Sequence, residues 1–235
     1  NDQTTLTIDG QAVLVEEAVT AQAVNFTEGG TAITLFSGTA QSDLSSGGNL
    51  TFTVTNTRAG DQLNFPTGIT NWTLSSLSLT TAVGTATSTG ITNLNYTVTT
   101  NNGATGTTTI TFSGSGISKS IKQSIINTVA FINTGDFPNR ANASVVTVTD
   151  SAANPTTLST NTLNITGVND SPVFTGTAGA TYTENAAGIA IVASAAVSDV
   201  DAANFGGGSV TVALGTYQTG DLLAIKNVGT GTGQI

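Results

Sequence analysis

The sequence of 235 residues contains no cysteine, no histidine and no methionine. Without cysteine the chain can form no disulfide and offers no thiolate to a metal or a substrate. Without histidine it lacks the general base of the usual Ser–His and Cys–His nucleophile pairs. The five Lys and Arg residues form no phosphate cradle, and no Gly-rich loop precedes a helix in a βαβ context. We therefore expect that the protein is not an enzyme.

Charged residues are scarce as well, at 8% of the chain against roughly 25% in an average soluble protein. The 14 acidic and 5 basic residues give a net charge of −9. No basic cluster is present to neutralise nucleic-acid phosphates or an anionic membrane surface. No apolar run approaches the ~20 residues of a membrane span, and no signal peptide opens the chain, so an export signal is expected to lie outside it. The acidic balance favours divalent cations as partners.

The residues that are abundant indicate β-structure. Val, Ile and Thr are frequent and suit a pleated, half-buried surface. Short runs such as "NLTFTVTNT", "TTTITFSG" and "SVVTVTD" alternate in polarity, and Gly-, Asn- and Ser-rich turns separate them. Asn102-Gly103 lies between two such runs and predicts a hairpin turn. The pattern predicts an all-β protein built as a sandwich or barrel of antiparallel strands.

One segment departs from this alternation. In "SKSIKQSIINTVAF" the apolar residues Ile121, Ile125 and Val129 recur every four residues, and Ser118 precedes them as an N-cap. This spacing predicts one short helix near 118–128, which would cross one end of the sandwich.

The chain also contains an internal repeat. "FTEGGTAITLFSGTAQSDL" aligns with "YTENAAGIAIVASAAVSDV", which pairs Glu28 with Glu184 at a constant offset of 156 residues. The match resumes later, where Asp61 aligns with Asp221 at an offset of 160. We interpret residues 1–168 as a complete module and 169–235 as the first part of a second. Because half a sandwich leaves apolar surface uncovered, we expect a continuation beyond Ile235, or another chain, to supply the missing strands.

Several motifs occur in a characteristic order along the repeat. "VNDSPVF" opens the second module and is followed by "YTEN", "SDVDAAN" and "GDLL". "KQSIINTVAFINTGDFPN" and "VTVTD" come near the end of the first module. This set resembles the cadherin-like, VCBS-type tandem repeats of large bacterial surface and secreted proteins. The resemblance implies tandem Greek-key (cadherin/Ig-like) β-sandwich modules of about seven strands each, often with calcium at the joints. The first module is longer than this pattern, with extra sequence at "TNWTLSSLSLTTAVGTATSTG".

The joint between the modules is the candidate metal site. Calcium takes six to eight oxygen ligands from carboxylates, carbonyls and amides. In an extended segment Asp199 and Asp201 point the same way, and the "ND" of the linker adds two more oxygen-bearing side chains. The resemblance adds Glu28 as a ligand from the preceding module. The predicted ligands are Glu28, Asn169, Asp170, Asp199, Asp201 and Asn204. In the alternative interpretation, the same Asp side chains bond to their own backbone in turns.

A second, degenerate metal site is predicted where the first module begins. The chain opens with another "ND", and the counterpart of "SDVD" reads "SDLS", so one carboxylate is missing. The residues of this site are Asn1, Asp2, Asp43 and Asp150.

The resemblance implies a function for the whole chain. It would be a non-catalytic stalk or fibre segment of a large exported bacterial protein, located outside the cell or on its surface. Its partners would be further copies of the same module, and flat Thr-rich strands favour self-assembly into filaments or a surface layer. The alternative is an adhesin module that binds a ligand or carbohydrate such as a surface glycan. An aromatic or Asp/Asn cluster on one face would favour the adhesin.

Overall fold

The computed structural model describes residues 3–8, 11–16, 22–36, 44–65, 68–101, 106–136, 138–152, 156–202, 204–226 and 229. Asn1, Asp2 and Asp43 of the second predicted metal site lie outside the described residues, as does the predicted turn at Asn102-Gly103. The chain divides into two compact units, Asn1–Asp201 and Ala202–Ile235. The seam that the repeat predicts, between residues 168 and 169, therefore falls inside the first unit.

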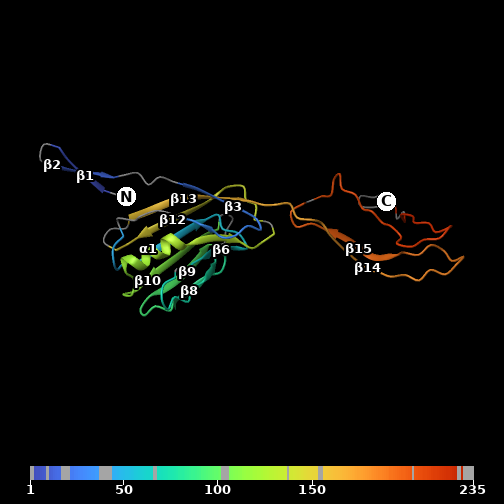
Figure 1. The fold of residues 1–235 in the computed structure, drawn as a ribbon, viewed down its shortest axis with the longest axis horizontal. Coiled ribbons are helices and arrows are strands. Elements are labelled where there is room, and N and C mark those ends of the chain that lie inside the picture. The colour runs from blue at the N-terminus through green and yellow to red at the C-terminus, as the bar shows by residue number, and fades with distance from the viewer. Residues whose placement is uncertain are drawn as a thin grey trace. The chain divides into compact units, whose positions relative to one another are not determined.

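The first unit contains two sheets that face each other (Figure 1). The larger sheet has the strand order β3-β13-β12-β5-β10-β9-β8, and the smaller has the order β4-β11-β6-β7. Of these pairs only β3 and β13 run parallel. In the larger sheet the strands are β3 (Gln22–Thr27), β5 (Leu50–Thr55), β8 (Val83–Ser88), β9 (Asn95–Asn101), β10 (Thr107–Ser113), β12 (Ser144–Asp150) and β13 (Thr156–Thr166). In the smaller they are β4 (Ile33–Thr34), β6 (Asp61–Asn64), β7 (Ser76–Ser78) and β11 (Ala130–Asn133).

The remaining elements of the described residues are two hairpins and one helix. β1 (Gln3–Ile8) pairs with β2 (Gln11–Glu16), and β14 (Val173–Ala178) pairs with β15 (Val192–Ser198). The helix α1 (Lys119–Thr128) begins after Ser118, whose hydroxyl accepts a hydrogen bond from the Ile121 amide. The predicted all-β sandwich with one short helix is confirmed. The two sheets hold more strands than the resemblance implied, and the extra sequence after Ile69 contributes two of them, β7 and β8.

Alternation along the central strands explains how the core forms. In β5 the residues Leu50, Phe52 and Val54 are fully buried, whereas the threonines between them are only partly buried. Phe65 follows β6 of the smaller sheet and packs against two rings of the larger sheet. Its ring centroid lies 6.2 Å from that of Phe52 and 5.4 Å from that of Phe112. These edge-to-face contacts join the two sheets and add about 0.5–1.5 kcal/mol per pair to the burial of the rings.

A buried ion pair joins the two sheets at one end of the sandwich. Both carboxylate oxygens of Asp61, on β6, accept hydrogen bonds from the Arg140 guanidinium at 2.8 and 3.0 Å. Asp61 also accepts a bond from the Asn133 amide on β11 at 2.7 Å. Arg140 in turn donates to the Asn56 carbonyl and the Ser144 hydroxyl, which follow β5 and begin β12. Because every charged atom is paired, the two ions can be held without water.

A second buried ion pair lies at the other end of β12. Lys122, on α1, is fully buried and donates to Asp150 at 2.5 Å and to the Gly47 carbonyl at 2.6 Å. The Asp150 carboxylate also accepts hydrogen bonds from the amides of Ser45 and Ala152. The pair therefore fastens the helix to the end of β12 and to the segment that precedes β5.

We expect Lys122→Met to lower the free energy of unfolding by about 3–5 kcal/mol, because it leaves the Asp150 carboxylate buried without a cation. Lys119→Met is the matched control, since Lys119 lies on the same helix but is exposed. It should change the free energy by no more than about 0.5 kcal/mol. Urea unfolding followed by circular dichroism measures both. Equal effects of the two substitutions would contradict the importance of the buried pair.

Large hydrophobic side chains are exposed in the later part of the chain. Where the structure describes side-chain burial, the exposed ones begin at Val168 and include Phe174, Tyr182, Val212 and Leu222, and each of these five is at least half exposed. Uncovered apolar side chains are the feature expected of a partial module. The division into one complete and one partial module stays a prediction.

Candidate metal-binding site

The strand pairing brings acidic residues from several segments to one place in the first unit. β3 and β13 run parallel with Thr27 opposite Thr166, so both strands end at the same edge of the sheet. Glu28, directly after β3, therefore lies beside the linker that follows β13, and its carboxylate accepts a hydrogen bond from the Val168 amide at 2.7 Å. A second contact fixes the linker, since the Asn139 side chain accepts a bond from the Gly167 amide at 2.8 Å.

The β14–β15 hairpin supplies the other side of the site. Val173 pairs with Ser198, so the residues before β14 lie next to those after β15. The backbone amide of Asp170 donates to the Asp201 carboxylate at 3.2 Å, and the amide of Asp201 donates to Asp199 at 3.1 Å. A pocket of about 360 Å³ lies between these segments and is lined by Asp136, Asp170, Ser171, Val173, Ser198, Asp199 and Val200. We call the group Glu28, Asp136, Asp170, Asp199 and Asp201 the joint carboxylates.

The surroundings of Asp170 and Asp201 disfavour the charged forms of these two carboxyl groups. The pKa of Asp170 is raised by burial and then by the negative charges of Glu28, Asp136 and Asp199. The pKa of Asp201 is raised by a side-chain hydrogen bond with Asp199 and by burial, against a lowering contribution from the Asp170 amide. These neighbours carry the same charge, so a bound cation would relieve their mutual repulsion.

Two oxygen atoms at the joint are shielded and have no partner. Oδ2 of Asp170 and Oδ1 of Asp201 are covered from solvent, yet neither has a hydrogen-bond partner within the described part of the chain. A carboxylate oxygen shielded from water without a donor is unfavourable. Hard, negatively charged oxygens are the donors that Ca²⁺ prefers, so the residues present fit such an ion. Within the described ranges, however, no three carboxylates already converge closely enough to hold one metal ion.

Only some of the predicted metal ligands lie among the joint carboxylates. Glu28, Asp170, Asp199 and Asp201 belong to the joint carboxylates. Asn169 is exposed, and its amide donates to the Asp170 carbonyl. Asn204 belongs to the second unit, where its side-chain oxygen accepts a bond from the Gly206 amide. The bond from the Asp201 amide to Asp199 is the local one that the turn interpretation predicted, so that interpretation and the metal site both stay open.

The sequence reasoning missed one of the joint carboxylates. Asp136 follows β11, and only the Gly-Asp pair within "INTGDFPN" could have drawn attention to it. It reaches the joint because the segment after β11 also carries Asn139, which bonds to the linker at Gly167. Asp150 of the second predicted site bonds to Lys122, and the partners predicted for it lie outside the described residues. That second site stays a prediction.

We compared the chain with family models, curated proteins and solved structures. No family model, no curated protein and no solved structure matches the chain. Among the described residues, no helix has the length and apolar character that crossing a membrane requires.

We expect the carboxyl groups of Asp170 and Asp201 to titrate above the ordinary Asp value of about 3.9 in metal-free solution. Because the folded joint holds these protons more tightly than the unfolded chain, its stability is greatest below that value. Stability then falls as the pH rises through the raised pKa. Carbon-detected NMR titration of the carboxyl groups measures the midpoints.

Glu28→Gln should lower the pKa of Asp170, because it removes one negative neighbour while the amide oxygen can still accept the bond from Val168. Glu184→Gln is the control, since Glu184 is the repeat counterpart of Glu28, is exposed and is not among the charges that act on Asp170. If the Asp170 midpoint were the same in Glu28→Gln as in the unmodified protein, the described geometry of the joint would be wrong.

Proposed function

We propose that this chain is a non-catalytic structural segment of tandem β-sandwich modules, in which Ca²⁺ fixes the joint between one module and the next. The observation that carries the proposal is the pair of shielded, unpartnered oxygens of Asp170 and Asp201 among like charges. The repeat and its resemblance to cadherin-like modules support the same assignment. Location outside the cell and assembly with further copies of the module belong to this proposal.

The joint residues would hold the ion from both sides of the linker. Asp170 and Asp201 would supply the two unpartnered oxygens, and the negative charges of Glu28, Asp136 and Asp199, which act on Asp170, would add to the attraction for the ion. The ion would supply positive charge that neutralises this cluster. Because Glu28 belongs to the first sandwich and Asp201 follows β15, an ion bound by both would restrict the linker that joins them.

We expect isothermal titration to show that the 235-residue chain binds Ca²⁺, because the joint offers several carboxylates to one ion. Asp201→Asn should weaken binding about 10-fold or more, since it removes a charge and a ligand oxygen. Asp221→Asn is the control, because Asp221 is exposed and accepts a bond from the Gln218 amide in a turn of its own. No heat of binding at millimolar Ca²⁺, or equal affinity in Asp201→Asn and the unmodified chain, would refute the calcium joint.

A further inference from the structure

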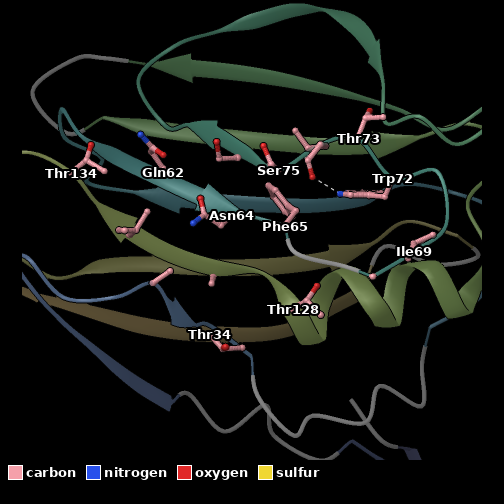
Figure 2. A pocket seen from close by; sticks show the side chains of 16 residues that line it. Thr34, Gln62, Asn64, Phe65, Ile69, Trp72, Thr73, Ser75, Thr128 and Thr134 are labelled. Atoms are coloured by element: carbon pink, nitrogen blue, oxygen red, sulfur yellow. Dashed lines mark hydrogen bonds between the residues drawn. The ribbon is translucent and has the colours of Figure 1, made fainter.

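The smaller sheet carries a hollow on the face opposite the core. The hollow has a volume of about 900 Å³, within the range of roughly 300–1,000 Å³ that is typical of ligand sites. Gln62 and Asn64 point into it from β6, where they alternate with the buried residues Asp61 and Leu63 (Figure 2). We call this hollow the outer groove.

The strand register aligns the floor of the outer groove. Thr34 of β4 lies opposite Ala130 of β11, Ala130 opposite Asn64 of β6, and Asn64 opposite Ser76 of β7. The four residues thus form one row across all four strands. Because Ala130 and Ser76 are small, the row leaves room above the sheet for a ligand lying across the strands.

The segment after β6 forms a wall of the groove. Trp72 and Ile69 lie at one side of it, beside Thr73 and Ser75 (Figure 2). The indole N–H of Trp72 bonds to the Leu74 carbonyl, and its ring packs 6.0 Å from that of Phe112. These contacts fix the orientation of Trp72, so its position in the wall is prepared before a ligand arrives.

The lining of the groove combines apolar and polar side chains and carries no charge. None of its residues is Asp, Glu, Lys or Arg, and most carry an amide, a hydroxyl or an apolar group. The side-chain oxygen of Asn64 is covered and has no hydrogen-bond partner among the described residues. Because the residue as a whole is only half-buried, a turn of its amide toward the groove would let that oxygen accept a bond from a ligand hydroxyl. A charged ligand would find no counterion here. A neutral ligand that carries many hydroxyls on an apolar ring frame matches both parts of the lining.

We propose that the outer groove binds a neutral saccharide chain. Gln62 and Asn64 donate to and accept from the sugar hydroxyls, and the exposed hydroxyls of Thr34, Ser75 and Ser76 add further bonds. Trp72 and Ile69 supply apolar surface to the C–H face of a sugar ring. This site is independent of the joint carboxylates, so the two proposals can fail separately.

The only tryptophan of the chain provides the measurement. We expect cellohexaose, maltohexaose or mannohexaose, tested separately up to 10 mM (about the range of weak binding), to change the Trp72 fluorescence and shift its indole NMR signal. The change should be the same with Ca²⁺ and with a chelator. An oligogalacturonate of similar length tests charge, and should bind at least about fivefold more weakly, since the groove offers it no cation.

Two substitutions locate the binding. Asn64→Ala and Gln62→Ala should each raise the Kd at least about fivefold, as the loss of one or two hydrogen bonds requires. Gln22→Ala is the matched control, because Gln22 is an exposed amide on β3 of the other sheet, and should leave the Kd unchanged. Thermal melting of each variant confirms that it is folded.

Three results would overturn the proposal. One is the absence of any Trp72 response to all three hexasaccharides at 10 mM (about the weakest binding of interest). Another is an unchanged Kd in both groove variants. The third is a change in the Trp72 fluorescence or indole NMR signal when the protein concentration is raised without sugar. That result would indicate that a second copy of this chain occupies the groove.

Discussion

Two buried ion pairs hold the sandwich at both ends, and the rest of the fold depends on them. β12 begins beside Arg140, which bonds to Asp61, and ends at Asp150, which bonds to Lys122. The chain has only five basic residues, and these two are buried with their carboxylates fully paired. Removing one partner of such a pair costs far more than the pair itself contributes, so each pair fixes which segments meet. One joins the sheets to each other, and the other joins the helix to the larger sheet.

The same electrostatic reasoning separates the core from the joint. In the core each buried carboxylate has a cation and several donors, and its charge is satisfied within the protein. At the joint five carboxylates lie near one another, and no cation contacts them among the described residues: Glu28 and Asp201 accept bonds from backbone amides, and Asp201 also shares a side-chain hydrogen bond with Asp199. Within the described part of the chain, one oxygen of Asp170 and one of Asp201 have no hydrogen-bond partner. No arginine or lysine lines the joint pocket. This difference between the core and the joint is the physical reason for our proposal that a Ca²⁺ ion from solution balances the joint carboxylates.

The sequence predicted local structure well and tertiary pairing poorly. Alternation in "NLTFTVTNT" and "SVVTVTD" marks β5 and β12, and Ser118 marks the start of α1, because each depends on neighbours in the chain. Asp61 accepts a local bond from the Arg58 amide, three residues earlier in the chain. Its bond to Arg140 could not be predicted, because the two residues meet only through packing. Asp136 and the outer groove were missed for the same reason, since their residues come from separate strands and connections.

The parallel pairing of β3 with β13 has a mechanical consequence. These are the first and last strands of the larger sheet along the chain, and they pair from Gln22 opposite Asn161 to Thr27 opposite Thr166. A tensile force applied where the chain enters β3 and leaves β13 would pull the two strands in opposite directions along their length. Their hydrogen bonds would then be loaded together in shear, rather than broken one after another as in a zipper. A sandwich closed in this way resists stretching through its whole terminal pair at once.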